Sequence, residues 1–173
     1  MSSRRRNNKN ASHDPRHQIL SGRVEKIEQV TFAAGVKSIV VSADMTNITD
    51  HLAQVYRYYR FTKLKFTFLP MATTNNNVVA AYVAGGGSST TGAADNSAEA
   101  KYAIAITNTT QVPITMSIAR EDLIQNQPWF ITETDATDAY LDIIGYLHVE
   151  GNGTEWFILK TELEYEFKFP MST

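Results

Sequence analysis

The chain has 173 residues, of which 43% are hydrophobic and 10% aromatic, and its formal net charge is −2. This composition fits one globular domain with an appendage, large enough to bury a core without a metal ion or disulfides. Cysteine is absent and no eighteen apolar residues occur in succession, which excludes disulfides, thiolate metal sites and cysteine nucleophiles and disfavours secretion or membrane insertion.

The first twenty residues are basic and hold almost nothing suited to a core. They contain five of the sixteen lysines and arginines and one acidic residue, whereas the rest of the chain carries eleven basic and seventeen acidic side chains. Because attraction to phosphate needs no fixed geometry, we expect residues 1–20 to be a mostly disordered arm that binds a polyanion such as a nucleic acid. The candidate RNA contacts are Arg4, Arg5, Arg6, Lys9 and Arg16.

Other interpretations of this arm stay open. It could be a solvated tail, a nuclear localisation signal or a remnant of an expression tag. It has no aromatic side chain on which a base could stack, so sequence-specific recognition is not expected. His13 and His17 are four residues apart, but Pro15 disfavours the helix on which that spacing could bind zinc.

The rest of the chain alternates between apolar and polar side chains in runs separated by Gly, Asn, Thr and Ser clusters. This period of two is typical of a β-sandwich or barrel. The first strands are predicted around residues 24–32 and 39–41. Thr49 or Asp50 is then expected to cap a short helix through residues 52–56.

The middle of the chain combines strands with an irregular segment. A strand is predicted over residues 63–69, which Pro70 ends, and another over residues 78–83. Residues 85–92 are rich in glycine and lack the Gly-Lys-Ser/Thr ending of a phosphate-binding loop, so they predict a flexible connection. A short helix is expected through residues 98–102.

The following segment predicts a strand over residues 112–118, where Pro113 indicates an edge or an early position. A short helix is expected over residues 119–124 and a further strand over residues 129–132. These elements again have short or irregular connections.

The last two runs, residues 141–149 and 157–169, show the clearest alternation and predict a hairpin of two long strands with a turn at residues 151–153. A slip by one residue in the final strand would bury a row of carboxylates, so its register is strongly fixed. These carboxylates belong to Glu162, Glu164 and Glu166. We expect their face to meet solvent or a cationic neighbouring subunit.

About eight strands with long connections favour an eight-stranded antiparallel jelly-roll sandwich with short helical connections, over residues 21–173. An immunoglobulin-like sandwich is the alternative, but it is usually shorter, near 100 residues, and has fewer helical excursions.

The densest acidic cluster lies between the last helix and the final strand pair. Asp135 and Asp138 are candidate ligands for a calcium ion at a subunit interface, because oxygen-rich loops bind calcium and a second subunit could complete the coordination. A solvated acidic loop is the simpler alternative, and no EF-hand spacing is present. No other cofactor is expected.

Two further groups of residues are candidate sites. His51 and His148 are isolated, and His148 is expected on the polar face of a strand; neither has a nearby nucleophile, so catalysis is not expected. The tyrosines and arginines of residues 56–61 could form a stacking surface for bases or a subunit interface, while part of them would pack in the core.

Residues 55–74, VYRYYRFTKLKFTFLPMATT, resemble the strand after the short helix in shell domains of sobemovirus and tombusvirus coat proteins. The order of parts is similar across the chain, from the basic arm to the final runs GYLHVEG and EYEFKFP. The resemblance implies an eight-stranded jelly roll that self-assembles into an icosahedral shell, with the arm turned inward onto packaged genomic RNA.

The resemblance also implies a virion protein assembled in the host cytoplasm. The short arm suits a small particle such as that of a satellite virus. Members of this family bind calcium between subunits through paired aspartates, for which Asp135 and Asp138 are the nearest match in type. The alternative function is a soluble carbohydrate-binding jelly-roll module, which would have no use for the basic arm.

Overall fold

The computed structural model describes residues 18–32, 35–70, 77–85, 101–107, 112–124, 127–132, 139–151 and 155–171. The strands found there are β1 (Leu20–Phe32), β2 (Gly35–Ser42), β3 (Tyr56–Pro70), β4 (Asn77–Ala84), β5 (Tyr102–Thr107), β6 (Ile114–Ile118), β7 (Phe130–Ile131), β8 (Ile143–Gly151) and β9 (Glu155–Pro170). The helices are the 3-10 helix η2 (Ala43–Met45), α1 (Asn47–Ala53), α3 (Arg120–Ile124) and α4 (Ala139–Asp142). None of these helices is long and apolar enough to cross a membrane.

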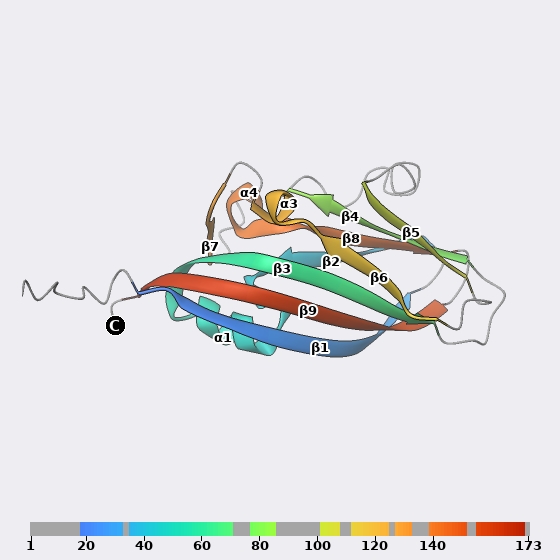
Figure 1. Cartoon of the computed structure of the whole chain (residues 1–173), viewed down its shortest axis with the longest axis horizontal. Coiled ribbons are helices and arrows are strands. Elements are labelled where there is room, and N and C mark those ends of the chain that lie inside the picture. The colour runs from blue at the N-terminus through green and yellow to red at the C-terminus, as the bar shows by residue number, and fades with distance from the viewer. Residues whose placement is uncertain are drawn as a thin grey trace, which may run out of the picture.

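The strands form two sheets that lie one over the other, with α1 at one end (Figure 1). Sheet A has the order β1-β9-β3-β6, and the two-residue strand β7 also pairs with β3. Sheet B has the order β2-β8-β4-β5. Strands adjacent in the chain repeatedly lie in opposite sheets, which is the topology of a jelly roll. The predicted fold class is therefore confirmed. β7 corresponds to the strand predicted over residues 129–132, and β5 is an additional strand that was not predicted.

The core is built around the long pair β3 and β9. Phe66 and Phe68 of β3 and Leu159 and Leu163 of β9 are at most 1% exposed, and Thr161 between the two leucines is also buried. Thr67, Lys160 and Glu162 lie on the opposite face. This confirms the alternation predicted for both strands, and Pro70 ends β3 as expected. The register shifts once, between Phe61 and Lys63, where β3 has an irregularity against β9.

The predicted hairpin between the last two runs is wrong. β8 pairs with β2 and β4 in sheet B, whereas β9 pairs with β1 and β3 in sheet A. The residues after Gly151 therefore connect the two sheets. The alternating pattern is the same for any strand with one face toward the core, so it does not show which strand is the partner. Leu141 also lies in α4 and not in a strand.

His148 lies on the face of β8 opposite the core residues Leu147 and Val149, as expected, but it is not exposed there. Residues 144–149 of β8 are all buried, and His148 is only 7% exposed. Its ring stacks on Tyr146, and its Nδ1 lies 2.8 Å from the Ser38 hydroxyl of β2. Burial lowers the pKa of His148, which favours the neutral imidazole. This histidine is a satisfied interior group.

Some predictions of the short elements are confirmed and others are not. The helix α1 begins earlier than expected, because Thr46 is its N-cap and forms a reciprocal capping box with Thr49. The helix expected over residues 119–124 is confirmed as α3, and β6 lies at the edge of sheet A as Pro113 indicated. The helix expected through residues 98–102 reaches a described residue only at its end, where Tyr102 begins β5.

Gly145 in the middle of β8 permits a close approach of two strands. A Cβ at this position would lie 2.5 Å from the Val83 carbonyl oxygen and 2.7 Å from the Tyr82 hydroxyl. The Val83 oxygen belongs to the backbone of a paired strand and cannot move aside as a side chain can. Gly145→Ala is therefore expected to lower the free energy of unfolding by about 1–3 kcal/mol. Urea unfolding measures this loss.

The matched control for Gly145→Ala is Gly22→Ala in β1. Its new Cβ would meet only the ring end of Tyr165, a side chain that can move. We expect a clearly smaller loss, and equal losses for the two variants would show that the strands do not approach each other closely at Gly145.

Candidate nucleic-acid interface

The side chains predicted to bind RNA all precede the described part of the chain. Arg4, Arg5, Arg6, Lys9 and Arg16 lie outside it, as do Asp135 and Asp138 of the candidate calcium site. The structure does show where the arm joins the body. The described chain begins at Gln18, and Leu20 is the first residue of β1, opposite Phe167 of β9.

The outward face of sheet A carries most of the charged side chains of β1, β3 and β9. Period-two alternation places them there, since the intervening residues face the core. The basic members are Arg23, Arg60, Lys63, Lys65, Lys160 and Lys168. The acidic members are Glu25, Glu162, Glu164 and Glu166. This face therefore has a small basic excess, although the body as a whole is acidic.

Glu162 lies at the centre of the ion pairs on this face. Its carboxylate is 3.0 Å from Lys65, 3.2 Å from Lys160 and 3.3 Å from Arg23, and its side chain is 12% exposed. The hydrogen bonds from Lys65 and then Lys160 lower the pKa of Glu162 to about 2. This lowered pKa keeps the carboxylate ionised at neutral pH.

The other carboxylates of the face also have cationic neighbours within the chain. Glu25 lies 3.0 Å from Lys160, and Glu164 lies 3.5 Å from Lys63. Glu166 accepts a 2.7 Å hydrogen bond from Nε of Arg60. The glutamates of β9 were expected to meet solvent or a cationic neighbour from another subunit, but the chain supplies their cations itself. The face thus does not repel a polyanion as strongly as its glutamates suggest.

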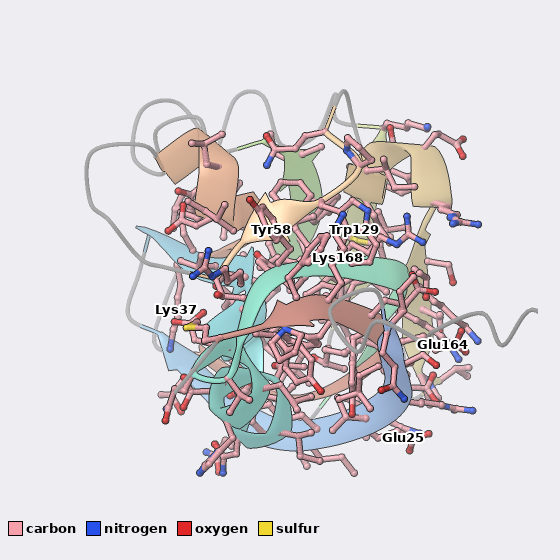
Figure 2. All side chains as sticks on the ribbon, turned by 90° about the vertical axis from the view of Figure 1, so that its left-hand side faces the viewer. Glu25, Lys37, Tyr58, Trp129, Glu164 and Lys168 are labelled. Carbon is pink, nitrogen blue, oxygen red and sulfur yellow. The ribbon has the colours of Figure 1, made fainter. Side chains whose placement is uncertain are left out.

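A second group combines cations with aromatic rings at the end of sheet A where β1 begins. We call it the Trp129 cluster; its members are Tyr58, Arg60, Trp129, Lys168 and Phe169. Figure 2 shows Tyr58, Trp129 and Lys168 close together on the end of the molecule that faces the viewer. The Arg60 guanidinium carbon lies 4.3 Å from the centre of the Trp129 ring, and Lys168 Nζ lies 4.0 Å from it.

The tyrosine and arginine run of β3 is divided between the core and this cluster. Tyr59 and Phe61 are fully buried, whereas Tyr58 and Arg60 point outward and are partly exposed. This confirms that part of the run packs in the core. The sequence did not predict the contribution of Trp129 or Lys168, because both reach the cluster only through the pairing of β3 with β7 and β9.

An acidic pocket of about 520 Å³ lies between η2, α1, β7 and α4, with carboxylates from Asp44, Asp50 and Asp142 in its lining. One oxygen of Asp142, Oδ1, is buried without a hydrogen-bond partner. Burial and then the charge of Asp44 raise the pKa of Asp142. Within the described ranges, no three histidine, aspartate or glutamate side chains are arranged to hold a metal ion.

The raised pKa of Asp142 predicts a pH-dependent stability. A carboxyl whose pKa is higher in the folded than in the unfolded chain stabilises the fold below its usual pKa, and this contribution is lost as pH rises through the folded value. The variant Asp142→Asn carries no such charge. Between about pH 4 and pH 7, the stability of this variant relative to the natural sequence should therefore increase with pH.

Urea midpoints of both proteins at pH 4, 5, 6 and 7 measure this difference. The Asp142 backbone carbonyl accepts a hydrogen bond from the Tyr59 hydroxyl, which the substitution keeps. Two parallel pH profiles would contradict the assignment of an unfavourable buried charge to Asp142.

No protein-family model and no curated relative matches the chain. Its fold is nevertheless shared by solved structures of small viruses. Tobacco necrosis virus matches with a TM-score of 0.68 and 15% identity, over 88% of this chain and 98% of that one. Cocksfoot mottle virus matches with a TM-score of 0.70 and 12% identity, over 99% and 93%.

A semi-empty VLP of the nodavirus of the giant freshwater prawn Macrobrachium rosenbergii matches with a TM-score of 0.74 and 10% identity, over 100% of this chain and 94% of that one. At such identities the likeness concerns the fold. It extends over the whole sandwich and confirms the resemblance seen in residues 55–74. The chain has the jelly-roll fold of the shell domains of small icosahedral RNA viruses.

Proposed function

We propose that the chain is a structural capsid protein that self-assembles into an icosahedral shell and packages single-stranded genomic RNA through its N-terminal arm. The observation that carries this proposal is the pair of sheets β1-β9-β3-β6 and β2-β8-β4-β5, which recurs as a fold in the solved virus structures. The protein is then a component of the virion, and its lack of cysteine suits assembly in the reducing host cytoplasm.

The proposed division of the chain follows its charge. Residues 1–20 act as the RNA-binding arm through Arg4, Arg5, Arg6, Lys9 and Arg16, and residues 21–173 act as the shell domain. Five cations without an aromatic partner in the arm favour binding by charge over the reading of a base sequence.

Negative-stain microscopy and light scattering of the purified full chain test the assembly step. Closed particles of uniform size are expected at moderate salt, because a shell domain associates with copies of itself. Finding only monomers across a range of salt and pH would count against a capsid function.

We also propose that Asp135 and Asp138 bind calcium at the interface between subunits. Two carboxylates from one loop leave coordination positions open, and calcium accepts six to eight oxygen ligands, so ligands from a second copy would complete the site. A chelator should lower the melting temperature or open the particles, and calcium should restore them. Particles whose melting temperature is the same with calcium and with chelator would remove this site.

A further inference from the structure

The Trp129 cluster contains a cation that the described part of the chain leaves without a counter-charge. Arg60 is paired with Glu166, at 2.5 Å from Nη2 and 2.7 Å from Nε. Lys168 has no carboxylate partner among the described residues; its ammonium lies instead near three aromatic rings. The distances from Nζ to the ring centres are 4.0 Å for Trp129, 5.2 Å for Phe169 and 5.4 Å for Tyr58.

The surroundings of Lys168 disfavour its positive charge. Burial and then the positive charge of Arg60 lower its pKa. The rings attract the ammonium through their π faces, but they do not neutralise it. An anionic group placed beside Lys168 and Arg60 would therefore be attracted by both cations. It would neutralise the positive charge of Lys168, since Glu166 is already paired with Arg60.

The backbone of β9 is distorted at this point in a way that gathers the cluster. Phe169 has a φ of 56°, in the left-handed region that residues with a side chain rarely adopt. Successive side chains of a regular strand point to opposite faces. Here Lys168 and Phe169 both reach the Tyr58 ring, at 5.4 Å and 5.8 Å. The unusual conformation thus puts an additional ring beside the unpaired cation.

The cluster lies where the basic arm joins the body. Lys168 follows Phe167, and Phe167 is the partner of Leu20 at the first position of β1. Both strands reach the same end of sheet A, on the left of Figure 1, which is the end turned toward the viewer in Figure 2. A polyanion bound by the arm close to residue 18 would therefore lie near the cluster.

We propose that the Trp129 cluster is a nucleotide-binding site of the shell domain, which holds a segment of the single-stranded RNA bound by the arm. Lys168 and Arg60 contact a phosphate, and an exposed part of the Tyr58 or Trp129 ring stacks with a base. This site rests on the proposed function, since it needs a nucleic acid as partner. Stacking on aromatic rings tolerates every base, so the site adds affinity without a sequence preference.

A neighbouring copy of the chain is the competing occupant, because tryptophan, tyrosine and arginine are also common at protein interfaces. The charges favour RNA. Each copy brings a basic arm to the same end of the sandwich, so the excess of cations there would grow on assembly, and RNA would be the polyanion that compensates it.

The test uses the full chain and a fluorescent twelve-nucleotide oligouridine. Lys168→Gln should weaken binding about three- to tenfold and lower the slope of log affinity against log salt by about 0.7, the value for one lost phosphate contact on a single strand. Trp129→Leu should weaken binding about fivefold or more, as loss of a stacking platform does. Lys168→Arg keeps the charge and should keep most of the affinity.

The matched control is Lys63→Gln, another outward lysine of sheet A, which is 52% exposed and paired with Glu164. Its effect should be much smaller than that of Lys168→Gln; equal effects would mean that the cluster is not a site. Ultraviolet cross-linking of the natural sequence to 4-thiouridine RNA is independent of any variant's folding. It should label peptides containing Tyr58, Trp129 or residues 165–170, and labels confined to the arm would overturn the site.

The outcomes separate this site from the function on which it rests. If the natural protein binds and packages RNA while the cluster variants bind it equally well, the site is wrong and the packaging function stands. If the variants keep RNA affinity but no longer form particles, the cluster is an interface between copies. If the natural protein binds no RNA, both proposals fail.

Discussion

Deletion of residues 1–16 is expected to abolish RNA packaging and to leave the jelly roll folded. The deletion removes Arg4, Arg5, Arg6, Lys9 and Arg16, which are five of the chain's sixteen basic residues. Five phosphate contacts on a single strand contribute about −3.5 to the slope of log affinity against log salt, or a loss of about 100-fold between 50 and 200 mM salt. RNA binding by the deleted protein should be weak and depend little on salt.

The body cannot replace these charges. Its outward glutamates on β9 are paired with its own cations, which weakens the attraction of these lysines and arginines for phosphate. The cluster at Lys168 would retain one weak contact. Fluorescence anisotropy with labelled single-stranded RNA at several salt concentrations measures the change.

The control for the deletion replaces the five basic residues of the arm with glutamine and keeps its length. Loss of packaging in this variant assigns the effect to charge, whereas packaging retained here but lost in the deletion assigns it to arm length. RNA binding that is unchanged in both variants would sink the proposed role of the arm.

The largest expected loss of stability comes from Phe66→Ala. Phe66 is fully buried in β3 and lies between Thr161 of β9 and Met116 of β6. Removal of a buried phenyl ring costs about 3–5 kcal/mol, because the transfer free energy is lost and a cavity remains. A domain whose free energy of unfolding is about 5–15 kcal/mol would lose a large part of its stability.

Urea unfolding at a salt concentration that keeps subunits apart measures this loss. The neighbouring Thr67 points to the opposite, outward face, where its hydroxyl lies 3.4 Å from that of Thr115. Thr67→Ala should change the free energy of unfolding by no more than about 0.5 kcal/mol. If the two variants were equally unstable, the register of β3 would have to be shifted by one residue.

Local alternation predicted the faces of the long strands, but it could not predict their partners. β9 follows its predicted faces from Phe157 to Lys168, including Thr161 on the core side, and departs from them only at Phe169. β8 has the same type of pattern, yet it lies in the other sheet. In a jelly roll the partners of a strand are distant in the chain, so hydrogen bonding between strands depends on topology that a local pattern does not contain. The hairpin prediction failed for this reason.

The missed strand and the misplaced helix start have local causes. β5 reads YAIAIT, and its short run with two alanines carries a weak strand signal beside polar segments. The start of α1 was predicted at Thr49 or Asp50 because several residues there can cap a helix. Thr46 takes that role because its hydroxyl accepts a hydrogen bond from the Thr49 backbone at 3.2 Å.

The two candidate interfaces differ in how far sequence could predict them. The arm is visible from composition alone, since its charge is confined to a stretch without core residues. The cluster is not, because Trp129 and Lys168 come together with Arg60 only when β7 and β9 pair with β3. The sequence indicated this surface at one place only, where Tyr58 and Arg60 alternate with the buried residues of β3.

Sedimentation of the purified full chain with single-stranded RNA, followed by nuclease treatment of the fast fraction, tests the capsid function most directly. A shell subunit that packages RNA gives fast, uniform particles in which the RNA survives the nuclease until high salt or denaturant opens the shell. Protein that sediments only as monomer, with the RNA fully digested across salt and pH, contradicts the proposed function.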